Sequence, residues 1–350
     1  MNNSDNGYHV AIVGATGMVG QEFIKVLLQR KFPVASLQLY ASDRSAGRKV
    51  YAGHQEMVVK ETASDSFDSV DIALFSAGSE ISKHFAPVAA KAGALVIDNS
   101  AAWRMDSRVP LVVPEVNPED IKKHKGIIAN PNCSTIQMVV ALYPLHRVNP
   151  IKRITVATYQ SVSGTGISAV EELTKQARVV LDGGNVVPHV YSHQIAFNLL
   201  PEIDVFLENG YTKEEWKMVE ETRKIMHAEN LAVSATCVRV PVFISHSEAI
   251  QVEFSDYMSP EEARSILSKA PGVKVLDDPN VSLYPQPWLA AGTDDVYVGR
   301  IRSDVSYLNG LVMWVVADNI RKGAALNAIQ IAEEAIRNGW VRQQNNNNNK

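Results

Sequence analysis

Cys133 is the residue of this sequence best placed for covalent chemistry. It lies in Asn130–Thr135, where the apolar run Gly126–Ala129 is followed by a proline and then by the apolar stretch Ile136–Val148. The first run predicts a strand and the second a helix, so Cys133 falls in the first helical turn. Backbone N–H groups at that position stabilise a thiolate and favour a nucleophile. The alternative is a buried, inert cysteine.

A thiol that attacks a carbonyl group needs a base nearby, and histidine is the natural one near neutral pH. Of the nine histidines, His246 is the best placed, because it lies between two expected strands and seven residues after Arg239. In one unbroken strand these side chains would face opposite sides, but Pro241 interrupts the ladder and allows them to converge. The alternative for His246 is a histidine hydrogen-bonded within the core.

A glycine-rich turn near the N-terminus predicts a dinucleotide site. Tyr8–Val13 has the pattern of a strand, and Gly14, Gly17 and Gly20 follow it as G-x-x-G-x-x-G before an amphipathic helix. In this context the backbone turns tightly, approaches a pyrophosphate closely and offers it a helix N-terminus. The first strand and helix of the chain are therefore expected to bind a dinucleotide.

The end of the next expected strand, Leu37–Ala41, bears on the choice between NAD and NADP. A lone carboxylate there favours the free 2′-hydroxyl of NAD, whereas arginine and hydroxyl groups favour the 2′-phosphate of NADP. Ser42, Arg44 and Ser45 surround the single acid Asp43. NADP is the expected cofactor, use of NAD as well stays open, and the alternative for Arg44 is an exposed turn.

Polar residues elsewhere fit anion binding or a plain structural role. Arg104 follows the expected strand Ala94–Asp98, whose carboxyl end should line a ligand crevice; the alternative is a solvated loop arginine. Glu214 and Lys217 share one face of a helix that a capping box starts at Thr212. A surface ion pair is the simpler account of Glu214 and Lys217.

The element pattern predicts an α/β protein. Strands and helices alternate up to about residue 150, which builds a parallel sheet, whereas Ile154–Gln160, Val233–Val242 and Ala249–Phe254 are longer strands with partial alternation. We expect a Rossmann-type dinucleotide-binding domain over 1–132 and 319–344, to which a terminal helix at 324–336 returns. A second α+β catalytic and dimerisation domain on a mainly antiparallel sheet should occupy 133–318, and the Asn-rich residues 345–350 predict a disordered tail.

Composition excludes several classes of partner. The formal net charge of −4 gives no reason to expect nucleic acid or a membrane surface. Two cysteines cannot form a disulfide framework, no Cys/His spacing predicts a metal site, and no signal or membrane-spanning pattern is present. These features predict a protein of a reducing compartment, the cytoplasm.

Several motifs together resemble aspartate-semialdehyde dehydrogenases from about Tyr8 to Trp340. The motifs are the glycine loop, Ile97–Ser100, Asn130–Thr135, Arg239–Pro241 with His246, and Asn319–Ala325. The resemblance implies an oxidoreductase of amino-acid biosynthesis (lysine, threonine and methionine), and a homodimer or homotetramer. The implied reaction is the reversible NADPH-dependent reduction of 4-phospho-L-aspartate to L-aspartate 4-semialdehyde and phosphate.

The resemblance also implies roles for individual residues. Cys133 would be the acyl-thioester nucleophile, His246 the acid/base and Gln160 the residue that positions the acyl group. Arg239 would bind the substrate carboxylate, Arg104 and Lys217 the phosphate and Glu214 the amino group, with Asn132 also at the substrate. The cofactor-binding residues would be Gly14, Thr16, Gly17, Met18, Val19, Ser42, Arg44, Ser45, Ser163, Gly164 and Asn319.

Two other functions stay open at this point. One is an acyl reductase on the same scaffold that uses malonyl-CoA or N-acetyl-glutamyl phosphate and keeps Cys133 and His246. The other is a catalytically silent NADP-binding sensor. Turnover of CoA thioesters alone would favour the first, and NADP binding without activity the second.

Overall fold

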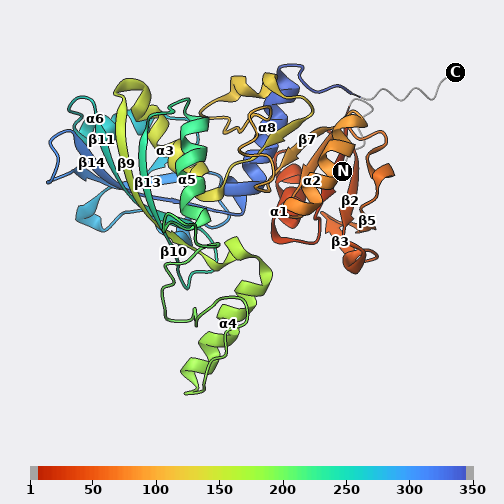
Figure 1. Ribbon diagram of the computed structural model, residues 1–350, viewed down its shortest axis with the longest axis horizontal. Helices are drawn as coiled ribbons and strands as arrows, with labels where there is room; N and C mark the ends of the chain where they lie inside the picture. The colour runs from red at the N-terminus through yellow and green to blue at the C-terminus, as the bar shows by residue number, and fades with distance from the viewer. Residues whose placement is uncertain (1–6, 344–350) are drawn as a thin grey trace. The chain divides into compact units, whose positions relative to one another are not determined.

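The computed structural model describes residues 7–343, which form two units (Figure 1). One unit contains the chain up to Pro131 and again from Ala324, and the other contains Asn132–Gly323. The residues from 319 to 323, expected in the first domain, thus lie in the second unit. The predicted tail at 345–350 lies outside the described residues.

The first unit is built on a six-stranded sheet whose order is β5-β2-β1-β6-β7-β8. Every neighbouring pair in this sheet is parallel. The strands are β1 (Tyr8–Val13), β2 (Val34–Ala41), β5 (Lys60–Glu61), β6 (Ile72–Phe75), β7 (Leu95–Asp98) and β8 (Ile127–Ala129), and a separate hairpin joins β3 (Lys49–Ala52) and β4 (Gln55–Val58). The predicted parallel sheet is confirmed.

Helices cover both faces of this sheet because alternate residues of its strands point to opposite sides. Val10 and Ile12 of β1 join a core with Phe23 of α1 (Met18–Gln29) and Ile329 of α8 (Leu326–Arg337). The intervening residues of β1 join a second core with α2 (Ser79–Lys91). The terminal helix therefore packs beside α1, and it begins after a π-helical turn, Arg321–Ala325.

The second unit contains a six-stranded mixed sheet, in the order β10-β9-β11-β14-β13-β12. Its strands are β9 (Ile151–Gln160), β10 (Ala232–Arg239), β11 (His246–Phe254), β12 (Val273–Val275), β13 (Val296–Ser303) and β14 (Gly310–Ala317). The expectation of a mainly antiparallel sheet describes the four central strands, but β10 and β12 at the edges pair in parallel. Two adjacent parallel strands need a connection longer than a hairpin turn, and the segment with helices α4 (Ile167–Leu181) and α5 (Lys213–Ile225) forms this connection between β9 and β10.

One face of the second sheet carries α3 (Cys133–Val148), α5 (Lys213–Ile225) and α6 (Pro260–Leu267). The capping box at Thr212 is confirmed, since Glu215 accepts from the Thr212 N–H and Thr212 accepts from that of Glu215. A helix that the sequence pattern did not reveal, α4 (Ile167–Leu181), extends away from the sheet (Figure 1). None of the described helices is long and apolar enough to cross a membrane.

Candidate active site

Cys133 is the first residue of α3, as predicted, and its side chain is partly accessible. Asn132 caps this helix, because its Oδ1 accepts from the backbone N–H groups of Ser134 at 3.0 Å and Thr135 at 3.3 Å. The Asn132 side chain therefore occupies two of the backbone N–H groups that were expected to stabilise a thiolate. Gly323 packs against the base of the Cys133 side chain, and a Cβ atom there would lie 2.8 Å from the Cys133 Cβ.

Strand register brings Arg239, Gln160 and His246 to one end of the second sheet. Arg239 and Gln160 are paired residues at the ends of β10 and β9. On the other side of β9, Ser247 pairs with Tyr159, so His246 lies beside Gln160 at the next position. Arg239 and His246 therefore converge because their strands, β10 and β11, pair with opposite edges of β9.

His246 is completely buried, and its hydrogen bonds define its tautomer. Its Nδ1 accepts from the backbone N–H of Ser161 at 3.0 Å. Because a backbone N–H can only donate, the neutral ring carries its proton on Nε2, which has no partner among the described residues. Burial, and then the charge of Arg239, lowers the pKa of His246 to about 3, so the ring is neutral near pH 7.

Because Gly164 has no side chain, the His246 imidazole and the Arg239 guanidinium both lie next to its backbone. A Cβ at Gly164 would lie 3.0 Å from Nη1 of Arg239 and 3.3 Å from Nε2 of His246. Arg239 is held there by a 2.7 Å hydrogen bond from Nη1 to the Ser161 carbonyl. Gly164 and Ser163 belong to a 3₁₀ turn, Val162–Thr165. The Nε2 proton of His246 and the charge of Arg239 are therefore both directed at the space beside Gly164.

Glu214 links Asn132, the residue before Cys133, to Gln160 at the end of β9. Its Oε1 accepts from Nδ2 of Asn132 at 2.8 Å and from Nε2 of Gln160 at 3.4 Å. Its Oε2 pairs with Lys217 at 3.0 Å, and Lys217 also contacts Asp204 at 2.8 Å. The Glu214 carboxyl group is buried, so the expected surface ion pair is wrong. Burial opposes its charge, but Lys217 and Asn132 outweigh burial and lower its pKa.

A second contact ties α3 to the histidine strand. Gln137, one helical turn after Cys133, donates from Nε2 to the backbone carbonyl of His246 at 3.3 Å. Cys133 therefore lies between two anchored neighbours, with Asn132 joined through Glu214 to Gln160 and Gln137 joined to His246. The structure thus gathers the predicted nucleophile and most of its predicted partners in one unit.

Asn319 lies in the second unit, where it orders the residues around His246. Its Oδ1 accepts from the Ser245 backbone N–H at 2.8 Å and from the Ser161 hydroxyl at 3.1 Å, and its Nδ2 donates to Ser163 Oγ at 3.0 Å. Asn319 was expected in the dinucleotide-binding domain with the segment 319–344, but it belongs to the second unit. Its amide binds the loop and strand that hold the imidazole.

The predicted dinucleotide loop of the first unit has the geometry of a cradle. Gly14 has φ +90°, and a Cβ there would lie 2.2 Å from the Ser76 carbonyl oxygen. Thr16 precedes Gly17, which starts α1 without a side-chain cap, and Met18 and Val19 form its first turn with no acidic residue. A backbone that leaves no room for side chains, at an uncapped helix N-terminus, fits a pyrophosphate.

The remaining predicted residues of the first unit lie at strand ends. Arg44 and Ser45 lie in a short 3₁₀ turn after β2, Asp43–Ser45, which Ser42 precedes, and Arg44 is exposed. Arg104 is buried rather than solvated, because its Nε donates to the Asn130 carbonyl at 3.0 Å and its Nη2 to the Asn99 carbonyl at 2.8 Å. The alternative of a solvated loop arginine is wrong for Arg104, whereas the exposed turn is the observed environment of Arg44.

Comparisons with known proteins agree with this arrangement. A family model described as the NAD binding domain of semialdehyde dehydrogenases matches residues 9–124, and one for their dimerisation domain matches 142–322. An aspartate-semialdehyde dehydrogenase of Aquifex aeolicus is 59% identical over 339 residues, 96% of this chain and 100% of that protein. One of Bacillus subtilis is 51% identical, over 93% and 97%.

The chain belongs to the aspartate-semialdehyde dehydrogenase family.

Solved structures of this family extend the likeness to three dimensions. The crystal structure of aspartate semialdehyde dehydrogenase II of Vibrio cholerae, complexed with ASA, matches with a TM-score of 0.93 at 47% identity, over 95% of this chain and 99% of that one. The enzyme of Candida albicans, solved with NADP, matches with a TM-score of 0.73 at 28% identity, over 95% and 99%. The α/β fold with a nucleotide-binding unit and a second, mixed-sheet unit is thus that of the family.

Sequence reasoning missed several residues that shape this site. Ser161 and Gln137 hold His246, Gly323 packs on Cys133, and Glu248 is fully buried two residues after His246. The period-two pattern of a strand offered one signal, since it places residue 248 on the same face as residue 246. The contacts of the others depend on partners far away in the sequence. No cluster of side chains that could hold a metal ion occurs within residues 7–343.

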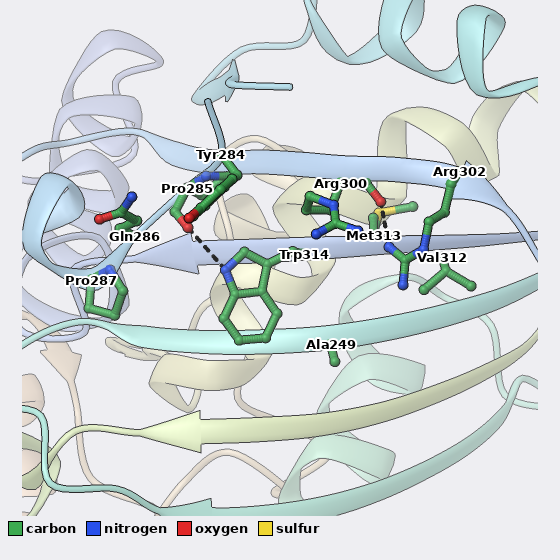
Figure 2. A pocket seen from close by; sticks show the side chains of 10 residues that line it. All are labelled: Ala249, Tyr284, Pro285, Gln286, Pro287, Arg300, Arg302, Val312, Met313 and Trp314. Atoms are coloured by element: carbon green, nitrogen blue, oxygen red, sulfur yellow. Dashed lines mark hydrogen bonds between the residues drawn. The ribbon is translucent and has the colours of Figure 1, made fainter. Parts of the chain in front are cut away.

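The opposite face of the second sheet carries a pocket of about 370 Å³. Figure 2 shows the Trp314 indole directed toward Pro285, whose carbonyl accepts from Nε1 at 3.1 Å. Ala249, Arg300 and Arg302 also line the pocket. Ala249 lies one position from Glu248 in β11 and therefore points away from the face that carries His246. This pocket is separate from the Cys133 cluster.

Proposed function

We propose that this chain catalyses the NADPH-dependent reduction of 4-phospho-L-aspartate to L-aspartate 4-semialdehyde and phosphate, and the reverse reaction. The observation that carries the proposal is the double anchoring of the thiol. Asn132 reaches Gln160 through Glu214, and Gln137 reaches His246, so the first turn of α3 is fixed against the row of polar residues at the sheet end. The relatives of Aquifex aeolicus and Bacillus subtilis are named aspartate-semialdehyde dehydrogenases, which supports this proposal.

Cys133 attacks the β-carbonyl carbon in this reaction. The sulfur–carbon bond forms as the carbon–oxygen bond to phosphate breaks, and the phosphate leaves with that electron pair and takes up a proton from solvent. The positive end of the α3 dipole favours the thiolate at this position. When bound, NADPH supplies the hydride that reduces the resulting thioester.

His246 acts first as a hydrogen-bond donor. The proton on Nε2 faces the space beside Arg239 and stabilises negative charge on the carbonyl oxygen as the tetrahedral centre forms. A neutral imidazole does this without a buried positive charge. When the thiohemiacetal collapses, its carbon–sulfur bond breaks, Cys133 leaves as the thiolate and the hydroxyl proton passes to solvent. Nε2 of His246 already carries a proton and keeps its hydrogen bond to the oxygen, so the acid/base role expected of His246 stays a prediction.

The charged residues around the thiol bind the rest of the substrate. Arg239 is buried and holds the substrate carboxylate, and the ionised Glu214 attracts the amino group. Gln160 positions the acyl group, and Lys217 binds the phosphate in exchange for part of its contact with Asp204. Arg104 belongs to the first unit, and the phosphate-binding role that the family resemblance implies for it stays a prediction.

The preferred cofactor is NADP. The exposed Arg44 with Ser42 and Ser45 offers one cation and two hydroxyls to a 2′-phosphate, whereas Asp43 accepts a hydrogen bond from the Arg44 backbone N–H at 2.7 Å. Gly14, Thr16, Gly17, Met18 and Val19 would hold the pyrophosphate. Ser163, Gly164 and Asn319 belong to the second unit, where Asn319 holds the loop of the other two, and their contact with the cofactor stays a prediction.

We further propose a homodimer formed through the face of the second sheet that carries Trp314 and the pocket beside it. Trp288, next to the pocket residue Pro287 in the short helix α7 (Pro287–Ala290), is exposed and would join this interface. Sedimentation at micromolar concentration tests it, and a Trp288→Glu variant should shift the protein toward monomer. A tetramer would need a further surface. The cytoplasmic location expected from the sequence stays a prediction.

The decisive experiment is the phosphate-dependent reduction of NADP by aspartate semialdehyde, followed at the absorbance of NADPH. Wild type should be active only when phosphate is present, and the NAD arm measures the preference for NADP. Activity with malonyl-CoA or N-acetyl-glutamyl phosphate but not with the semialdehyde would contradict the proposal. NADP binding without any turnover would instead indicate a sensor.

A further inference from the structure

Glu248 is a fully buried acid that the proposed reaction does not use. It lies on β11 two residues after His246, so both side chains point to the face that α3 covers. Its register partners are Thr158 of β9 and Val315 of β14. Neither carboxyl oxygen receives a hydrogen bond from a donor among the described residues. An ionised carboxylate in such a place would be costly.

Gln137 is the polar side chain that acts on the Glu248 carboxyl group. Burial raises the pKa of Glu248, and Gln137 is the one side chain that opposes this rise. Gln137 is placed at this strand by its hydrogen bond to the His246 carbonyl, two residues before Glu248. The Gln137 amide nitrogen already donates to the His246 carbonyl, while its Oε1 has no described partner. A carboxylate and an amide oxygen are both acceptors, so the pair lacks one proton. A protonated acid supplies it.

We propose that Glu248 is a neutral carboxylic acid whose hydroxyl donates to Oε1 of Gln137, and that this pair is a positioning device between the helix of Cys133 and the strand of His246. The role rests on the proposed function of those two residues. The donated proton fixes which way the Gln137 amide points, with oxygen toward Glu248 and nitrogen toward His246. Without it the amide is free to turn, and the link from helix to strand is lost.

The geometry explains why such a link matters. Gln137 follows Cys133 by one helical turn and therefore lies on the same side of α3, and Glu248 follows His246 by one strand repeat. The pair thus sets the separation of nucleophile and imidazole without touching substrate. Small displacements of reacting groups are expensive, and an error of about 1 Å can cost about 100-fold in rate.

Three variants and one control test the proposal in the full-length enzyme. Glu248→Gln keeps a neutral side chain that donates from its amide, and Glu248→Met keeps the shape and removes the donor. Gln137→Met removes the partner. Glu253→Gln makes the same change on the same strand, at a partly exposed carboxylate that pairs with Arg153 at 3.0 Å.

The kinetic expectation is a fall in kcat with little change in KM. Glu248→Met and Gln137→Met should each lower kcat of the folded enzyme about tenfold with KM within about twofold, and the double variant should lose no more than either alone. Glu248→Gln should stay within about twofold of wild type, as should Glu253→Gln. Equal losses in Glu248→Gln and Glu248→Met, or a lower melting temperature with unchanged kcat, would overturn the positioning role.

An infrared measurement tests the proton independently of turnover. At pH 7 wild type should show the carbonyl band of a protonated carboxyl group, and Glu248→Gln should lack it while Glu253→Gln keeps it. Absence of the band in wild type would refute the neutral acid. If wild type shows the band but does not turn over aspartate semialdehyde, the proposed function has failed and the protonated pair remains.

Discussion

The two units of this protein build their sites in opposite ways. The first offers backbone: a contiguous turn from Gly14 to Gly20, where a Cβ atom at either of these two glycines would lie 2.2 Å from a backbone oxygen. The second offers side chains, and it collects Cys133, Gln160, Arg239 and His246 from an α-helix and three strands. A backbone site can be recognised from neighbouring residues, whereas a side-chain site depends on strand register. The comparison predicts that mutations in the side-chain site lower the rate of turnover, whereas mutations in the backbone site weaken cofactor binding.

The largest effect should come from the side-chain site. Cys133→Ala should lower kcat at least about 1,000-fold because no other group can form the thioester, while NADP binding to the first unit stays within about twofold. Steady-state rates and a fluorescence titration with NADPH measure the two quantities. Cys237→Ala is the matched control, since burial raises the pKa of that thiol and keeps it inert. Equal losses in both cysteine variants would contradict the assignment.

Gly14→Ala should break the backbone site. A Cβ there would lie 2.2 Å from the Ser76 carbonyl oxygen at a φ of +90°, so β1 and β6 must separate or the turn must change. We expect at least about a tenfold weaker binding of NADPH together with a lower melting temperature. Gly47→Ala is the control, because φ is +83° there but no atom lies within 4 Å of its Cβ.

The Gly47 control should cost only the strain of a left-handed residue, about 1–2 kcal/mol. If Gly14→Ala binds NADPH as well as the control does, the close approach of the turn to Ser76 is not what shapes the site. The Cys133 alkylation rate should be unchanged in both glycine variants, since that thiol lies in the second unit.

The buried imidazole makes the second unit sensitive to acid. The folded pKa of His246 is about 3, below its value of about 6.5 in the unfolded chain, so between these pH values the unfolded state binds more protons. Stability therefore falls as pH falls below about 6.5. From pH 6.5 to 5 wild type should lose about 2 kcal/mol more than His246→Gln does, in urea titrations at each pH. Parallel curves for the two proteins would refute a buried neutral histidine.

The smallest effect should appear at the exposed edge of the first unit. Arg44→Ala should raise KM for NADP about tenfold and leave KM for NAD within about twofold, because it removes one cation from the 2′-phosphate. Lys25→Ala, an exposed cation on α1 whose side chain is 65% accessible, is the control and should change neither value. Equal changes for both cofactors would mean that Arg44 does not read the phosphate.

The sequence was a good guide wherever neighbours within a few residues decide the outcome. The strand, glycine turn and helix at Gly14, the capping box at Thr212 and the position of Cys133 in the first turn of α3 are all local patterns, and each is present. The mainly antiparallel sheet was a partial success, because pairing at the two edges depends on crossovers that hydropathy does not reveal. The exposed ion pair at Glu214 was wrong, since helix periodicity does not say what covers a helix.

Only the tertiary structure decided which distant groups share an environment. Sequence left open whether Arg239 and His246 converge, and the register of β10, β9 and β11 brings them together. The tertiary structure also directs the amide of Asn319 toward Ser161 and Ser245, and it buries Glu248 near Gln137. Local patterns fix backbone conformation because they act over one or two turns. The protonation and hydrogen bonding of buried groups depend on partners that only folding supplies.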